Sequence, residues 1–515
     1  MSDNSKRLAV VVTVITFLCK MFGFLKNSIL AYYYGTSPVV DAYVMTFSIG
    51  TITSGWIAGL IGNFTPKYQE IQTVRGHKKA ILFSSQVINL IVFLVVALVI
   101  LLEIFSPHIV KIVAPGFTNE TYYYTVYYFR IYCISVPFYA LFRFFQEFLN
   151  CNQNHLAAVA PDLLMSSMCI IAIIISHYIG SNVLILGYVF AIVAQSIATH
   201  LSSRKIGFNF RVTELWNKDL RSLMVMAIPI FLSDTLANIN NLIDKVFASK
   251  LESGIVSALD YANTMKDFAY QIGTIAISIM VFPVISKLWA ENDYKGFNEK
   301  VVKGLDFFSA MYIPLVVGIV VAGDLVIHIV FGRGAFSEAA GNITSNAFII
   351  YSISLLAMTY RCIFLKAFYA MQKTSYILLV SFSNVLLNVI LNFALVRRYG
   401  YIGLTFATTI AAVLCLPIYF VLFRRMTNVS YKLFACKFAR CLICAGIMGS
   451  VIYFVKKVMY SFWENSFLEN ILLLVLILVV GAIVYVCAGV LFKIDEVVDL
   501  LSYIIRKIKH NIYKD

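Results

Sequence analysis

Residues 90–102 read LIVFLVVALVILL, an unbroken row of apolar side chains. With few interruptions the apolar run extends from residue 80 to residue 103. A bilayer has a hydrocarbon core roughly 30 Å thick, and about 20 residues of α-helix are needed to cross it. Apolar residues in this run are continuous and do not alternate with polar ones, so the run is not typical of a strand in a membrane β-barrel. The stretch therefore predicts a helix that spans a membrane.

Similar runs occur along the whole chain. They fall at residues 8–33, 42–64, 124–148, 156–178, 182–201, 222–247, 255–285, 307–330, 342–370, 375–396, 402–422, 439–456 and 467–492. Of the 515 residues, 60% are hydrophobic and only 13% are charged, whereas soluble proteins carry about 25% charged residues. The first run is too long for the apolar part of a signal peptide. The sequence thus predicts an all-α polytopic membrane protein with about 14 transmembrane helices.

Lysine and arginine gather in alternate connections between these runs, around residues 67–79, 204–221, 287–303 and 424–437. Positive residues stay on the cytoplasmic side of a membrane, so this pattern predicts a multi-pass membrane protein with both termini in the cytoplasm. Arg397 and Arg398 are a local exception. The net charge of +15 is then explained by topology and by contact with anionic membrane lipids. No nucleic-acid-binding motif occurs, and we expect no nucleic-acid partner.

An internal repeat divides the chain. The turn at Asp41 has a counterpart at Asp260, and the segment 153–187 has one at 372–403, with offsets of about 216–220 residues, or six spans. An even number of spans leaves both copies in the same orientation, which predicts two six-helix lobes in parallel pseudo-repeat plus two C-terminal helices. The predicted boundaries are 1–201 for the N-terminal lobe, 202–221 for a basic cytoplasmic linker, 222–425 for the C-terminal lobe, 426–492 for the two additional helices and 493–515 for an amphipathic cytoplasmic tail.

Charged and amide side chains interrupt three of the spans. The first span carries Lys20, Lys26 and Asn27, and a charge at the centre of a bilayer costs about 2.5–3.5 kcal/mol on insertion scales. The seventh and eighth spans each carry a helical stripe of polar residues. In the seventh span the stripe is formed by Asp234, Asn238, Asn241 and Lys245, and in the eighth by Asp260, Asn263, Lys266, Asp267 and Gln271. These stripes favour a water-filled cavity, in which the lysines would bind a phosphate or pyrophosphate. The alternative is that the polar residues pair with one another and lock the bundle.

A second set of oxygen-bearing side chains is compatible with Na⁺. Its members are Asp244 in the seventh span, Asn384, Asn388 and Asn392 in the eleventh, and Thr405, Thr408 and Thr409 in the twelfth. Hard oxygen ligands with one carboxylate suit a small cation, although Asn ladders in membranes also join helices by hydrogen bonds. Apart from Na⁺ we expect no cofactor. Cys436, Cys441 and Cys444 have no His near them in the sequence, so buried inert thiols are the better interpretation than zinc.

Enzymatic motifs are missing from the sequence. There is no G-x-x-x-x-G-K-[ST] loop, no G-x-S-x-G and no H-E-x-x-H. We therefore expect a transporter and not an enzyme, driven by ions, the membrane potential or the substrate gradient.

Several motifs together resemble one known family. Residues 19–27 read CKMFGFLKN and are followed by Tyr34-Gly35 and Asp41-Ala42-Tyr43; FGRGAF occurs at 331–336, KAFYAMQ at 366–372 and NVILN at 388–392. In this order, over about residues 12–425, they resemble the MurJ/MviN lipid II flippases. The resemblance implies the MATE-like flippase fold, with a lipid-tail groove at residues 426–492. It implies alternating-access translocation of an undecaprenyl-pyrophosphate-linked saccharide, a lipid II-like precursor of peptidoglycan, across the bacterial cytoplasmic (inner) membrane.

The resemblance also assigns residues. The family's cavity cations fall on Lys20 and Lys26 and its loop aspartate on Asp41, whereas two of its arginines fall on Ser54 and Thr264. With the polar residues beside them, the expected substrate-binding set is Lys20, Lys26, Asn27, Asp41, Asn263, Thr264 and Lys266. The family's Na⁺ site falls on Asp244, Asn388, Asn392, Thr408 and Leu404, the last through its carbonyl.

Alternatives remain at this stage. The two missing arginines leave a Wzx-type capsule or O-antigen flippase open. A MATE-type exporter of small molecules is a further rival, but it would not need the two additional C-terminal spans. A membrane scaffold without transport would have little use for lysines in a cavity.

Overall fold

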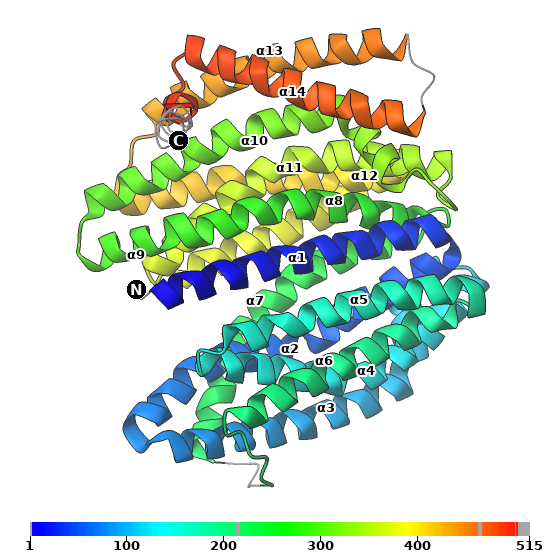
Figure 1. Cartoon of the computed structure of the whole chain (residues 1–515), viewed down its shortest axis with the longest axis vertical. Coiled ribbons are helices and arrows are strands. Elements are labelled where there is room, and N and C mark those ends of the chain that lie inside the picture. The colour runs from blue at the N-terminus through cyan, green and yellow to red at the C-terminus, as the bar shows by residue number, and fades with distance from the viewer. Residues whose placement is uncertain (1–2, 213–216, 462–465, 500, 503–515) are drawn as a thin grey trace, which may run out of the picture. The chain divides into compact units, whose positions relative to one another are not determined.

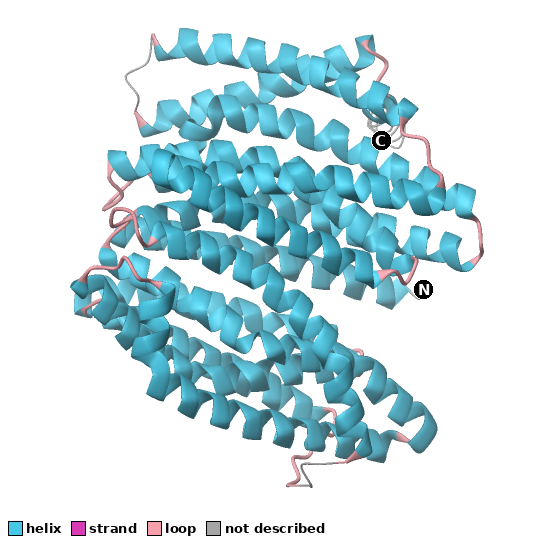
Figure 2. Cartoon of the chain, turned by 180° about the vertical axis from the view of Figure 1, so that it is seen from behind, coloured by secondary structure: helices cyan, strands magenta, loops and turns pink. Residues whose placement is uncertain are grey.

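The computed structural model describes residues 3–212, 217–461, 466–499 and 501–502, and nearly all of them are helical (Figure 2). No strand occurs within these ranges. Part of the predicted tail, at residue 500 and residues 503–515, lies outside the described residues. The multi-pass helical class predicted from the apolar runs is confirmed.

The helices follow one another with short connections. In chain order they are α1 (Asp3–Tyr34), α2 (Pro38–Arg75), α3 (His77–Val113), α4 (Asn119–Cys151), α5 (His155–Ile179), α6 (Asn182–Lys205), α7 (Lys218–Ala248), α8 (Ile255–Ala276), the π-helix η1 (Ile277–Val281), α9 (Phe282–Ala290), α10 (Tyr294–Phe331), α11 (Glu338–Ala370), α12 (Thr374–Thr427), α13 (Lys432–Tyr460) and α14 (Phe467–Leu491).

Every predicted span is helical, but three of the spans do not correspond to one separate helix each. α12 contains the eleventh and twelfth spans, which are separated by a break at Gly400, where φ is 57° and ψ is −134°. The eighth span is divided into α8, η1 and α9. By length and composition, 10 helices of the described chain are apolar enough to cross a membrane. α4, α7 and α8, which contain predicted spans, are not among these ten.

Unit 1 is a compact bundle of α1–α7 together with the loop Gly334–Ser337. Within it α2 packs against α4 and α7, and α5 packs against both α1 and α6 (Figure 1). The approach of α2 to α7 is close, since a Cβ atom placed on Gly59 would lie 2.8 Å from the carbonyl oxygen of Ala227. Small residues permit such contacts between membrane helices. The lobe boundaries predicted from the repeat, which put α7 in the second lobe, stay a prediction.

Unit 2 is a second compact bundle that contains α8 from Ala258 onward and α9–α14. α10 lies between α11 on one side and α13 and α14 on the other, and contacts all three (Figure 1). A buried apolar cluster joins α10 to α13 and α14, and the hydroxyl of Tyr485 on α14 donates to the carbonyl of Ala310 at 2.9 Å. The two C-terminal helices are therefore built onto α10 and do not stand alone.

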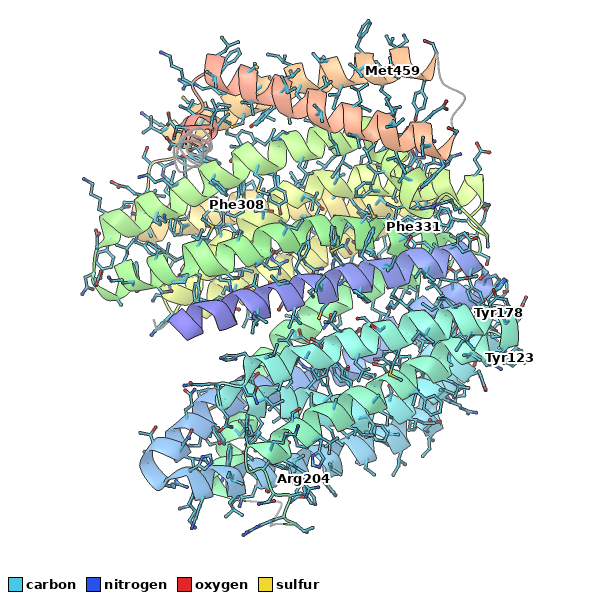
Figure 3. The ribbon with its side chains drawn as sticks, viewed as in Figure 1. Tyr123, Tyr178, Arg204, Phe308, Phe331 and Met459 are labelled. Carbon is cyan, nitrogen blue, oxygen red and sulfur yellow. The ribbon has the colours of Figure 1, made fainter. Side chains whose placement is uncertain are left out.

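The ends of the unit 1 helices differ in chemistry. Figure 3 shows Tyr123 of α4 and Tyr178 of α5 at one end of the bundle and Arg204 of α6 at the opposite end. Aromatic residues are typical of membrane interfaces, and basic residues are typical of the cytoplasmic side. This distribution is the one that the charge pattern of the sequence predicts for α6.

Candidate functional site

The lysines of α1 occupy an otherwise apolar helix. Lys20 is exposed, and Lys26 and Asn27 are half-buried. α1 packs mainly against α5, and the hydroxyl of Tyr34 donates to Oγ of Ser176 on that helix at 2.7 Å. One side of α1 is therefore held by α5, and two ammonium groups remain accessible along the helix.

Three polar side chains around α5 were missed by the sequence analysis. They are Arg143 on α4, Asp162 on α5 and Gln195 on α6. The side-chain amide of Gln195 donates to Oδ1 of Asp162 at 2.6 Å. Arg143 donates to the side chain of Gln146 at 2.7 Å, and Gln146 donates to the carbonyl of Ala158 at 3.0 Å. Unit 1 thus contains a guanidinium group and a carboxylate in adjacent membrane helices.

The polar stripe of α7 is engaged in part with its surroundings. Asn238 donates to Oδ2 of Asp234 at 3.0 Å, and Lys245 donates to Oγ of Ser48 on α2 at 2.8 Å. Asp234 also lies against α2, because a Cβ atom on Gly55 would be 3.2 Å from its Oδ2 atom. The contacts of Lys245 and Asp234 with α2 favour helix-to-helix bonding for this part of the stripe.

Asp41, predicted as a substrate residue, sits in the first turn of α2 and is 1% exposed. Its Oδ2 atom accepts from the backbone N–H of Gly254 at 2.6 Å. Its Oδ1 atom accepts from the backbone N–H and the hydroxyl of Ser257, at 2.8 and 2.7 Å. The carboxylate therefore fastens the connection between α7 and α8 to the start of α2. A role for Asp41 in binding substrate stays a prediction.

Lys266 is a buried cation of unit 2. Its side chain donates to Oδ1 of Asn263 at 2.5 Å and lies 3.4 Å from Oδ1 of Asp267. The ammonium also stands 5.4 Å from the centre of the Tyr351 ring. With 7% of its surface exposed, Lys266 is more fully paired than Lys20.

Four of the five predicted Na⁺ ligands come together along α12. Asn392 donates to Oδ1 of Asn388 at 3.1 Å, and Asn388 donates to Oγ1 of Thr408 at 3.3 Å. The hydroxyl of Thr408 donates to the carbonyl of Leu404 at 3.2 Å. The two halves of α12 are thus joined by a buried set of oxygen and amide groups, which fits a small cation in donor type. The fifth residue, Asp244, belongs to unit 1.

The positions where the resemblance expects arginines hold small hydroxyl residues. Ser54 is buried and donates to the carbonyl of Gly50 in its own helix at 2.7 Å. Thr264 is half-buried in α8. Neither supplies a cation. The predicted substrate residues are divided between the units, with Lys20, Lys26, Asn27 and Asp41 in unit 1 and Asn263, Thr264 and Lys266 in unit 2.

The ten cysteines form no disulfide with one another in the described chain. All of them are free thiols, and Cys441 and Cys444 are buried. In the described ranges no group of three or more His, Cys, Asp or Glu side chains is arranged to hold a metal.

A helical bundle with this order of elements has the fold of MATE family transporters. An inward-facing multidrug resistance MATE family transporter of the MOP superfamily matches with a TM-score of 0.66 and 14% identity, over 81% of this chain and 98% of its own. The structure of a lipid II flippase MurJ in an inward closed conformation matches with a TM-score of 0.79 and 23% identity, over 94% of this chain and 99% of that one.

The family itself follows from the sequence comparison. The model of the family described as lipid II flippase MurJ matches residues 30–474, and the chain belongs to this family. A probable lipid II flippase MurJ of Rickettsia prowazekii (strain Madrid E) is 23% identical over 508 residues, which are 96% of this chain and 98% of the relative. Another, from Synechocystis sp., is 23% identical over 97% of both chains. The chain is therefore a multi-pass membrane protein of a flippase family, as the motifs predicted.

Proposed function

We propose that this protein moves a lipid-linked saccharide with a pyrophosphate head, a lipid II-like precursor, across the bacterial cytoplasmic membrane by alternating access. The single observation that carries the proposal is the presence of lysines inside membrane helices, Lys20 and Lys26 in α1 and Lys266 in α8. Because each charge costs about 2.5–3.5 kcal/mol in a bilayer, an anionic cargo gives a reason for keeping them. The pyrophosphate would bind to these ammonium groups without being cleaved, so the protein acts as a transporter and not as an enzyme.

The two C-terminal helices support a lipid cargo. α13 and α14 bury one face against α10, whereas Phe454 on α13 and Ile483 on α14 remain 66% and 58% exposed. An exposed apolar surface of this kind suits a membrane or a prenyl chain. In our proposal the prenyl tail follows α13 and α14 while the head group enters the bundle, and the tail never leaves an apolar environment.

Ser54 and Thr264 favour a second candidate of the same class. A flippase without the two arginines could carry a different undecaprenyl-pyrophosphate saccharide, such as a capsule or O-antigen repeat unit. A MATE-type exporter of small molecules is the weaker alternative, because it leaves α13 and α14 without a role.

The proposal is tested in bacteria depleted of their own lipid II flippase. Expression of this chain should restore growth and cell shape, and labelling of the exposed precursor should show lipid II at the outer face of the membrane. A parallel strain that lacks its O-antigen flippase distinguishes the second candidate. Restoration of O-antigen alone would contradict lipid II as the cargo, and restoration of neither would contradict the flippase.

We also propose that Na⁺ binds to Asp244, Asn388, Asn392, Thr408 and the carbonyl of Leu404. If so, NaCl should raise the melting temperature of the purified protein above that in choline chloride. Asp244→Ala should abolish this difference. Asn384→Ala, which removes the member of the same ladder outside the ligand set, is the control and should keep it. An unchanged Na⁺ response in Asp244→Ala would return these residues to joining helices.

A further inference from the structure

The register between α1 and α5 places a lysine opposite a carboxylate. Tyr34 on α1 bonds to Ser176 on α5, and the rings of Tyr33 and His177 lie 4.8 Å apart. The two helices run in the same direction in Figure 1. Lys20 lies 14 residues before Tyr34, and Asp162 lies 14 residues before Ser176. Fourteen residues make close to four turns, or about 21 Å of helix. An equal step back along two parallel helices therefore brings Lys20 and Asp162 to the same level, on the faces where α1 and α5 meet.

Arg143 reaches the same carboxylate from α4. The bond from Gln146 to the carbonyl of Ala158 fixes the register of α4 on α5. Arg143 comes one turn before Gln146 and Asp162 one turn after Ala158. Because α4 and α5 are consecutive and antiparallel, both steps lead in the same direction. Electrostatic interactions of Asp162 with Arg143 and with Lys20 agree with this geometry.

The cluster therefore has two cations and one carboxylate, which Gln195 holds from α6 at 2.6 Å. Its net charge is +1 with Asp162 ionised. Lys20 is exposed and Arg143 is half-buried, so a ligand can reach both cations.

We propose that Asp162 is the internal counter-anion of Lys20 and Arg143, and that the phosphate oxygens of the cargo displace it from these cations. The inference rests on the proposed function and names two residues of its binding site. Arg143 supplies the guanidinium fork that Ser54 and Thr264 do not, and such a fork binds phosphate in a bidentate manner. Asp162 is a positioning residue: it pairs with the cations when no cargo is bound and takes them back when the cargo leaves.

If Asp162 competes with the anion for Lys20 and Arg143, its removal should have the opposite effect to removal of a residue that binds the anion directly. Removal of Asp162 should tighten binding of the anion and slow its release, whereas removal of Arg143 should weaken binding. Asn at position 162 keeps an acceptor for Gln195 and is nearly isosteric with Asp. The change therefore removes the charge and leaves the hydrogen bond between α5 and α6 in place.

The test measures binding of three probes to the purified full-length protein in detergent: geranylgeranyl pyrophosphate, geranylgeranyl monophosphate and geranylgeraniol. Asp162→Asn should bind the pyrophosphate about tenfold more tightly, the effect of removing one nearby charge in a partly screened site. Its affinity for the neutral alcohol should not change, and its growth rescue should fall. Arg143→Gln should weaken pyrophosphate binding by about tenfold, and Arg143→Lys should restore part of it.

Two controls separate the possible failures. Glu103→Gln removes a carboxylate that lies 4.0 Å from Arg130 elsewhere in unit 1, and it should leave all three affinities unchanged. Asp162→Ser repeats the removal of charge with a smaller side chain. If either Asp162 variant folds and binds the pyrophosphate no more tightly than wild type, the inference is wrong. It is also wrong if both fail to fold while Glu103→Gln folds, because Asp162 would then be a structural residue. Equal binding of all three probes by the wild-type protein would instead contradict the proposed function.

Discussion

Individual lysines in the membrane helices differ in how their charge is compensated. Lys266 has an amide, a carboxylate and an aromatic ring within reach and is nearly buried. Lys20 is exposed in an apolar helix and faces a single carboxylate across α1 and α5. A cation that is only partly compensated attracts an anion more strongly than one that is fully paired. Of the two, Lys20 is the better candidate for contact with the cargo.

The charge of the α1 lysines should be required for transport. Lys20→Gln and Lys26→Gln keep much of the side-chain length and some hydrogen bonding but remove the charge. We expect both variants to insert and fold normally and to lose rescue of a flippase-depleted strain. Arg at either position should retain part of the activity, because it restores the charge with a broader donor group. Well-expressed Gln variants with full activity would show that the pyrophosphate is bound elsewhere, with Lys266 the next residue to test.

Asp41 should behave as a structural residue. Its carboxylate accepts two backbone N–H groups and one hydroxyl, and a hydrogen bond to a charged acceptor is worth about 1.5–3 kcal/mol. Asp41→Ala leaves Gly254 and Ser257 without this acceptor, and we expect it to destabilise the protein by about 3 kcal/mol, seen as a lower melting temperature. Ser257→Ala should have a smaller effect of the same sign. Loss of transport by Asp41→Asn at an unchanged melting temperature would instead favour contact with substrate.

At the scale of elements, ion pairs attach α13 to the rest of unit 2 at both of its ends. Near the C-terminal end, Lys456 lies 2.6 Å from Oδ1 of Asp324 on α10. Near the N-terminal end, Lys437 lies 3.4 Å from Asp306 on α10 and 3.0 Å from Asp495, which follows α14. Between these ends α13 packs on α10 through the side chains of the buried apolar cluster. The charged pairs therefore determine how far α13 can slide along α10.

The pair at the C-terminal end of α13 can be tested by exchanging its charges. Lys456→Asp places two carboxylates together and should destabilise the protein by about 1 kcal/mol, seen as a melting temperature lower by a few degrees. The effect is small because Asp324 is partly exposed and its charge is screened. Asp324→Lys should have a similar effect. The double variant should recover most of the loss. Additive losses in the double variant would show that the two side chains contribute independently.

At the scale of the whole molecule, the orientation in the membrane follows from the distribution of charge and is open to measurement. In a background without the native cysteines, Cys in place of exposed Arg204 should be inaccessible to an impermeant thiol reagent added outside the cell. Cys in place of Tyr178 or Ser337, both exposed, should react. The cytoplasmic position of Arg204 follows from the retention of positive residues on that side. The reverse pattern would invert the proposed topology.

The sequence predicted the helices well because the hydrocarbon core imposes a minimum length of apolar residues, which is readable without any tertiary information. It did not predict the π-helix at residues 277–281, since nothing in an apolar run indicates an extra residue in one turn. It also missed Asp162 and Arg143. Both are charged residues inside predicted spans, which is a usable signal, but their spacing forms no stripe on either helix. Their partners lie on other helices, and only the packing of α4, α5 and α6 brings them together.

The π-helix gives the eighth span one point at which its length can change. A π turn holds one residue more than an α turn, so deletion of a single residue within Ile277–Val281 should leave an ordinary helix with α8 and α9 unchanged in direction. The same deletion inside α8 would rotate Lys266 and its neighbours by about 100° relative to α9. Relatives of this protein that differ in length by one residue in this span should therefore carry the insertion or deletion at this turn.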